Sequence, residues 1–298
     1  MKQLKMMVFM VVAFALIIPA AVMARGIEPV VSVEWLEKNL ATPSLVVVDI
    51  RKVEEYQAGH IPGAINIFYN ILAPGKGDLK NELPPDDDLR DVLSSNGINT
   101  DSLVVVAGIN DTPSDRVGMT RVAMTFIYAG VPNVAVLDGG ITKWAASGKS
   151  LSKDAVKPKA KDYKGKFNKG LFIKKEDLAA KIGKATIVDT REPDFFNGVK
   201  KLDFVARAGH IKGAVNLPAT SLLFAPDGTY KPMADLRALA LKAAGEDLGK
   251  EVILYCDTGK FATSWWFLMT EAFGYTNAKV YDGSSQDWAK DANLPMEP

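Results

Sequence analysis

One thiol stands out among the side chains that could do chemistry. Cys256 is the only cysteine in the 298 residues, and it directly follows the apolar run Val252–Tyr255. A short polar loop that contains Gly259 connects it to the helix-like segment Ala262–Ala272. Backbone N–H groups at the start of a helix stabilise a thiolate and lower its pKa. The sequence therefore predicts a cysteine nucleophile, and a small buried apolar residue is the alternative interpretation.

Five residues of the loop after the cysteine are candidates for contact with a substrate. They are Asp257, Thr258, Gly259, Lys260 and Phe261. Gly259 permits a tight turn because glycine adopts positive φ, and the N–H groups through Phe261 would surround the sulfur. Lys260 could attract an anion and Thr258 could donate its hydroxyl, although a solvated lysine and a hydroxyl bonded within the loop are equally good readings. Asp257 should repel an anionic substrate and raise the pKa of the thiol.

The composition excludes several classes of protein. The formal net charge is +1 and 48% of the residues are hydrophobic, which is typical of a globular protein without a nucleic-acid-binding surface. One cysteine and two histidines form neither an internal disulfide nor a Cys/His cluster, so we expect no metal and no cofactor. A cysteine phosphatase would need a longer loop and an arginine at the position of Ala262, which disfavours that class.

The first residues of the chain, 1–24, have the pattern of a secretory signal peptide. Lys2 and Lys5 precede the apolar stretch 6–21, and small residues close the segment at Ala24. Signal peptidase requires such small residues, so we expect cleavage after Ala24 and export, most simply to a periplasm. An uncleaved membrane anchor is the alternative, because the apolar stretch is only slightly shorter than a bilayer span.

Strands and helices alternate along the rest of the chain. Continuous apolar runs such as Leu45–Asp49 and Leu103–Ala107 are typical of strands that are buried on both faces. Helical segments, among them Arg116–Ala129, lie between these runs, and Asn70–Glu82 is predicted to be a loop. This alternation predicts an α/β fold in which helices cover both faces of a parallel sheet.

A lysine-rich stretch separates two halves of the chain. Residues 148–170 contain eight lysines and almost no apolar side chains, which predicts an exposed linker. A docking patch for an anionic surface is the alternative interpretation of the lysines. We therefore place an N-terminal domain at residues 27–147 and a C-terminal domain at residues 171–298.

The two halves repeat the same motifs. Val47–Arg51 recurs as Ile187–Arg191, and Gly59–Asn66, with its Gly-His-Ile turn, recurs as Gly209–Asn216. A closing Asp-Gly-x-x-x-x-Trp segment also occurs in each half. Two copies of one α/β unit predict a pseudo-symmetric tandem of domains.

The order of these motifs, in duplicate, resembles the rhodanese superfamily of sulfurtransferases in its two-domain form. The resemblance implies two rhodanese-like domains and an active cysteine in the C-terminal one. The N-terminal copy has Gly108–Asp111 at the equivalent place, without a cysteine, and is expected to be inactive. The activity implied is transfer of a sulfane sulfur from thiosulfate or 3-mercaptopyruvate, through a persulfide on Cys256, to a thiol or cyanide. Asp257 departs from thiosulfate-using relatives, which often have a cation directly after the cysteine.

Three further residues are candidates for the site. Arg191 follows a strand at the sheet edge where α/β folds bind ligands, and its guanidinium could grip an oxyanion of the donor. An ion pair with Asp189 is the alternative, because Arg51 has the same place in the copy without a cysteine. Asp189 and His210 are expected to be mainly structural, and Arg207, in an insertion of the second copy, is a weaker candidate.

Two other functions are compatible with the sequence. A carrier would hold a persulfide or a selenium atom on Cys256 and deliver it to a protein partner. The acidic Asp257 and the expected export are compatible with such a carrier. A binding module with a buried, inert cysteine is the other possibility, and the glycine-containing turn after Cys256 disfavours it.

Overall fold

The computed structural model describes residues 25–298, so the expected signal peptide lies outside the described residues. In the N-terminal half the elements are β1 (Val30–Val31), α1 (Val33–Asn39), β2 (Leu45–Asp49), α2 (Val53–Ala58), β3 (Ile65–Asn66), α3 (Tyr69–Leu72), α4 (Asp86–Ser95), β4 (Leu103–Ala107), α5 (Pro113–Ala129), β5 (Asn133–Leu137) and α6 (Gly140–Ala146). In the C-terminal half they are η1 (Lys169–Leu171), α7 (Lys175–Ala179), β6 (Thr186–Asp189), α8 (Pro193–Phe196), β7 (His210–Ile211), β8 (Val215–Asn216), α9 (Thr220–Leu223), α10 (Met233–Ala244), β9 (Val252–Tyr255), α11 (Ala262–Glu271), β10 (Ala278–Val280), α12 (Ser284–Trp288) and β11 (Met296–Glu297). Among these helices, none is long and apolar enough to cross a membrane.

Each half contains a parallel sheet, and the two sheets have matching strand orders. The N-terminal order is β1-β5-β4-β2-β3 and the C-terminal order is β10-β9-β6-β8, with every pair in both sheets parallel. Strands β4 and β9 therefore have equivalent central places. The predicted α/β fold with two copies of one unit is confirmed. An antiparallel pair of β7 and β11 was not predicted, because His210–Ile211 has the sequence of a turn.

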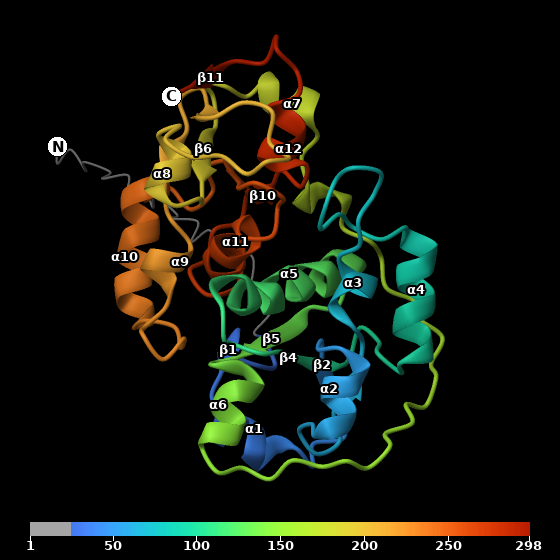
Figure 1. The fold of residues 1–298 in the computed structure, drawn as a ribbon. Coiled ribbons are helices and arrows are strands. Elements are labelled where there is room, and N and C mark those ends of the chain that lie inside the picture. Colours follow the sequence, from blue (N-terminus) through green and yellow to red (C-terminus); the bar gives the residue numbers. More distant parts are fainter. Residues whose placement is uncertain (1–24) are drawn as a thin grey trace, which may run out of the picture.

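The two domains share one hydrophobic core. Helices α5 and α11 pack against each other at the centre of the molecule, between the N-terminal sheet and the C-terminal sheet (Figure 1). One cluster of buried side chains joins Val106 and Met124 of the first domain to Leu254 and Trp265 of the second. Alternate strand residues point to the opposite face of each sheet, where each domain has a cluster of its own. The core that the two domains share through α5 and α11 therefore fixes the position of one domain relative to the other.

A buried ion pair crosses this shared core. Arg121, in the middle of α5, is fully buried, and its guanidinium donates to both carboxylate oxygens of Asp282 at 2.5 and 3.1 Å. Burial disfavours the charged guanidinium, but the Asp282 carboxylate outweighs this and raises the pKa of Arg121. Asp282 follows β10 in the segment that closes the C-terminal domain, so the pair ties that segment to the N-terminal domain.

Helix α5 begins earlier than predicted. The sequence pattern predicts a start at Arg116, whereas the helix starts at Pro113. Thr112 caps it, since its hydroxyl accepts from the N–H of Asp115 at 3.2 Å and the Asp115 carboxylate accepts from the N–H of Thr112 at 2.9 Å. This reciprocal capping, together with proline at the first helical position, shortens the loop after β4.

Two predicted irregular segments are more ordered than expected. Asn70–Glu82 was predicted to be a loop, but its first residues belong to α3, which is too short to show a helical period. Most of stretch 148–170 is irregular and its lysines are largely exposed. Its backbone nevertheless forms hydrogen bonds with the backbone of the N-terminal domain at His60, Ser94 and Tyr128. Tyr163 is buried there and donates its hydroxyl to the carbonyl of Ala129 at 2.8 Å. The lysine-rich segment is therefore anchored on the N-terminal domain.

Candidate active site

Cys256 lies at the carboxyl end of the central strand β9 and is fully buried. The N–H of Thr258 points at its Sγ at a distance of 3.5 Å. The N–H groups of Phe261 and Ala262, at the start of α11, also lower the pKa of the thiol. Backbone N–H donors of this loop thus act on the sulfur, and they suit a negatively charged sulfur atom.

The turn after Cys256 depends on Gly259 and on a serine that the sequence analysis missed. Gly259 has a φ of +77°, and a Cβ there would lie 2.5 Å from Oδ1 of Asp282. The hydroxyl of Ser284 accepts from the N–H of Cys256 at 3.2 Å and from that of Gly259 at 2.9 Å. Ser284 itself has a φ of +51°, where the first copy has Gly140. The repeat, where serine replaces a glycine that follows Asp-Gly, could have revealed it.

The pKa of the thiol differs from the sequence-based expectation. Burial raises the pKa of Cys256 to about 11, and the charge of Asp257 adds to the rise. The backbone N–H groups lower the pKa of the thiol, but their effect is smaller than the rise that burial and Asp257 cause. A lowered pKa was expected from the helix start, and that expectation was wrong because the fold removes the sulfur from water. The resting protein therefore holds a neutral thiol at neutral pH.

Alkylation of Cys256 tests this pKa directly. Only the thiolate reacts with iodoacetamide, so the rate should still rise above about pH 8.5, the pKa of a free cysteine. Asp257→Asn should increase the rate at each pH because it removes the neighbouring charge that raises the pKa of the thiol. The alkylation rates are followed by intact mass. A wild-type rate that stops rising at a pH below about 8.5, the pKa of a free cysteine, would contradict the buried neutral thiol.

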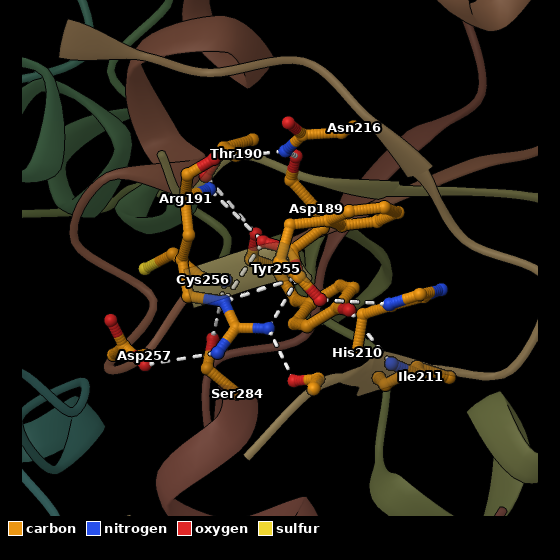
Figure 2. A network of polar contacts seen from close by, with 12 residues as sticks. Asp189, Thr190, Arg191, His210, Ile211, Asn216, Tyr255, Cys256, Asp257 and Ser284 are labelled. Atoms are coloured by element: carbon orange, nitrogen blue, oxygen red, sulfur yellow. Dashed lines mark hydrogen bonds and ion pairs between the residues drawn. The ribbon is translucent and has the colours of Figure 1, made fainter. Parts of the chain in front are cut away.

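Arg191 belongs to a framework that both domains share. Its guanidinium donates to the Asp189 carboxylate at 2.6 to 3.1 Å and to the carbonyl of Gly209 at 2.8 Å (Figure 2). Arg51 makes the same contacts in the first copy. The second copy adds a contact of 3.4 Å from Nη1 to Oδ1 of Asp257. The predicted ion pair is present, and contact of Arg191 with a donor stays a prediction.

The N-terminal domain reaches over the loop that carries Cys256. The side-chain amide of Asn81 donates to the hydroxyl oxygen of Thr258 at 2.9 Å, and the hydroxyl of Tyr69 donates to Oδ1 of Asn81 at 2.8 Å. Lys260 donates to the hydroxyl of Ser114 at 2.9 Å and lies over the ring of Tyr69. Burial lowers the pKa of Lys260 to about 8. Both loop side chains are therefore held by the other domain.

Two cavities occupy equivalent places at the carboxyl edges of the two sheets. The N-terminal cavity has a volume of about 290 Å³ and contains Arg51 and Lys260 in its wall. The C-terminal cavity has a volume of about 220 Å³ and is closed on one side by Pro113 of the N-terminal domain. Its other lining residues are Thr190, Arg191, Glu192, Phe195, Leu202, Thr220, Asp257 and Phe261. The second cavity, beside the loop of the cysteine, is the candidate substrate site.

The remaining candidates support the framework. Arg207 donates to carbonyls between Trp288 and Leu294, so it holds the C-terminal segment. His210 stacks on Phe196, with ring centres 3.8 Å apart, and its Nδ1 contacts the carbonyl of that residue. Asp189 binds Arg191 as expected of a structural residue. Within residues 25–298, no group of three or more Cys, His, Asp or Glu residues is placed to hold a metal ion.

Comparison with known proteins agrees with this architecture. The rhodanese-like domain family matches two stretches of the chain, residues 32–147 and 174–291. A Saccharopolyspora erythraea protein named "Putative thiosulfate sulfurtransferase" is 32% identical over 286 residues, which span 91% of this chain and 96% of that protein. The "Sulfur carrier protein TtuD" of Thermus thermophilus is 28% identical over 284 residues, which span 90% of this chain and 96% of that protein.

Solved structures share the tandem fold. The anaerobic ergothioneine biosynthesis enzyme from Chlorobium limicola matches with a TM-score of 0.79 at 22% identity, over 90% of this chain and 70% of that one. The crystal structure of YnjE matches with a TM-score of 0.78 at 27% identity, over 90% of this chain and 68% of that one. The two family matches cover most of the sequence, and they contain every strand of the two parallel sheets except β1. The chain therefore belongs to the rhodanese family, with two rhodanese-like domains in tandem.

Proposed function

We propose that this rhodanese-family sulfurtransferase takes a sulfane sulfur from a small anionic donor, thiosulfate or 3-mercaptopyruvate, and holds it as a persulfide on Cys256. A thiophilic acceptor, a thiol or cyanide, then removes the outer sulfur. The two half-reactions alternate on one nucleophile, which is covalent catalysis of the ping-pong type. The site needs no metal ion and no organic cofactor for this chemistry.

The observation that carries the proposal is the set of backbone N–H groups that act on Sγ of Cys256. The N–H of Thr258 lies 3.5 Å from the sulfur, and those of Phe261 and Ala262 come from the first turn of α11. A persulfide places a negatively charged sulfur where these donors converge, so they stabilise the intermediate more than the neutral thiol.

Steady-state kinetics with both donors test this function. Initial rates with thiosulfate or 3-mercaptopyruvate, each against cyanide and a dithiol, should give the parallel double-reciprocal lines of a ping-pong mechanism. Asp257 beside the thiol predicts that 3-mercaptopyruvate, with a single negative charge, is the better donor. Absence of transfer from either donor to either acceptor would refute the small-molecule activity.

A carrier of persulfide or selenium is the second candidate. The relative named "Sulfur carrier protein TtuD" matches nearly its whole length, and the acidic Asp257 disfavours small anionic donors. A carrier would pass its cargo to a protein partner. Mass spectrometry of the protein isolated from its host would show Cys256 with an added sulfur or selenium atom, and a thiol that is always unmodified would exclude this role.

We also propose that the protein is exported through its N-terminal segment 1–24. The support is the sequence pattern of basic residues, apolar stretch and small residues before Arg25. Fractionation of the host followed by N-terminal sequencing tests this directly. A mature chain in the periplasm that begins at Arg25 is expected, and a membrane-bound chain that keeps Met1 would show that the leader is an anchor.

A further inference from the structure

We propose that Asp257 is the general base for an uncharged thiol acceptor that binds in the C-terminal cavity. The inference rests on the proposed function, because it concerns the step that discharges the Cys256 persulfide. Asp257 would take the proton of the acceptor thiol and return it to the sulfur of Cys256. The acceptor class follows from the walls of the cavity, its charges and the position of this one carboxylate.

The walls of the C-terminal cavity are mainly apolar. Phe195, Leu202 and Phe261 form much of its surface, and Pro113 of the N-terminal domain closes it. Small-molecule sites of this kind hold an apolar body and use a few polar groups to orient it. The equivalent place in the N-terminal cavity has Glu55 where this one has Phe195. The C-terminal cavity is thus shaped for an organic acceptor more than for a small hydrated anion.

The charges around the cavity disfavour an anion. The wall of the cavity contains one guanidinium, that of Arg191, and two carboxylates, those of Glu192 and Asp257. The same guanidinium is already paired with the buried carboxylate of Asp189. Lys260 does not correct the balance, because it lies in the wall of the N-terminal cavity and not in the wall of this one. An anionic thiolate would therefore be repelled, whereas a neutral thiol enters without this penalty. A neutral thiol must lose its proton before or during its attack on the persulfide.

Asp257 is placed to accept that proton. It adjoins Cys256 in the sequence, its charge is felt by the sulfur, and its side chain lines the cavity. In the described chain, its one side-chain hydrogen bond is the long contact of 3.4 Å from Arg191, which leaves the other oxygen available. Figure 2 shows this contact, with the Cys256 sulfur pointing away from the framework around Asp189. The carboxylate therefore lines the acceptor space and belongs to the loop that also carries the sulfur.

The acidities of the two groups support the direction of proton transfer. Burial raises the pKa of Asp257 to about 6, with Arg191 acting against the rise and Asp189 adding to it. The carboxylate is thus ionised at neutral pH but is a stronger base than an ordinary aspartate. The pKa of Cys256, raised to about 11 by burial and by Asp257, means that the departing sulfur takes up a proton readily.

The step conserves atoms and electrons without any further reagent. The S–H bond of the acceptor breaks and its proton passes to Asp257, while the acceptor sulfur forms a bond to the outer sulfur of the persulfide. The bond between the outer sulfur and Sγ of Cys256 breaks, and its electron pair stays on Sγ. Sγ then takes the proton from Asp257. The products are the Cys256 thiol and an acceptor persulfide, in which the outer sulfur keeps its own protonation state.

Single-turnover discharge of the loaded protein tests the inference. Wild type and Asp257→Asn are first loaded with sulfur, and intact mass confirms the persulfide on Cys256. Discharge to 2-mercaptoethanol, a neutral thiol, should be slower in Asp257→Asn by about 10²-fold, the lower end of general-base effects, because thiols are already acidic. Discharge to sulfite near pH 8, which has no proton to lose, should be equal or faster, because a repelling charge is gone. An equal rate with the thiol, or an equal slowing with both acceptors, would overturn the proposal.

Glu192→Gln is the matched control, since it also removes one negative charge from the wall of the cavity. If Asp257 acted through its charge alone, Asp257→Asn and Glu192→Gln would change the ratio of the thiol rate to the sulfite rate by the same factor. That result would refute the base role. Failure of the wild type to load sulfur would instead refute the proposed function itself. Should Asp257→Asn not fold, the wild-type pH profile decides. Discharge to the thiol should fall as pH drops through about 6 and level off above it, whereas a rate that keeps rising toward the pKa of the acceptor thiol would contradict the base role.

Discussion

Replacement of Cys256 by serine should abolish sulfur transfer, with a loss of more than about a thousandfold in kcat/KM for either donor. Serine keeps the approximate size of the side chain and the backbone N–H groups beside it, but an alcohol oxygen cannot store a sulfane sulfur. The loss should be the same with thiosulfate and 3-mercaptopyruvate, because both load the same atom. The measurement is the initial rate of sulfur transfer to cyanide and to a dithiol.

The fold must survive the serine substitution for this result to count. Cys256 is fully buried, but serine is of similar size. We therefore expect the thermal unfolding temperature of the protein to change by only a few degrees in Cys256→Ser. Thr276→Ala, at an exposed position near the end of the domain, is a suitable control that should keep full activity. Substantial transfer by folded Cys256→Ser would show that the sulfur travels through another group or needs no covalent intermediate.

Arg121→Ala should lower the free energy of unfolding by roughly 3–5 kcal/mol, the second large effect that we expect. The substitution removes a fully buried guanidinium and leaves the Asp282 carboxylate without its partner in the core that the two domains share. An uncompensated charge in such a place is far more costly than the lost attraction alone. Urea unfolding, followed by tryptophan fluorescence, measures the change.

Two comparisons separate this ion pair from charge loss in general. Lys164→Ala breaks the exposed pair with Asp162, and its effect should stay within about 0.5 kcal/mol. The double variant Arg121→Met with Asp282→Leu removes both charges, and it should recover much of the stability lost in Arg121→Ala. An Arg121→Ala protein as stable as Lys164→Ala would show that the interdomain pair carries little of the stability.

The fold could be predicted because the repeat and the apolar runs are local signals. Runs such as Leu45–Asp49 and Leu103–Ala107 each became a strand with the predicted bounds. Which element packs against each buried face depends on residues far away in the sequence, so a local pattern does not reveal it. Nothing in the sequence around Arg121 shows that its ion-pair partner lies in the other domain, at Asp282, or that α5 packs on α11. The shared core therefore appeared only in the structure.

The site was predictable in its parts and less so in its electrostatics. The nucleophile and the glycine turn follow from Cys256 and Gly259, and the ion pair of Arg191 follows from its repeat in the first domain. The pKa of the thiol depends on burial, which the sequence around Cys256 does not reveal, so its direction was predicted wrongly. Attraction of an anionic donor by Lys260 stays a prediction, and its hydrogen bond to Ser114 of the other domain could not be predicted from the sequence of the loop.

The most direct test of the central claim is the mass of the protein after exposure to donor without acceptor. The account predicts one added sulfur atom, found on the peptide that contains Cys256, with 3-mercaptopyruvate and more slowly with thiosulfate. Addition of a thiol should remove this sulfur and restore the original mass. A protein that turns over both substrates while Cys256 stays an unmodified thiol under excess donor would contradict the account.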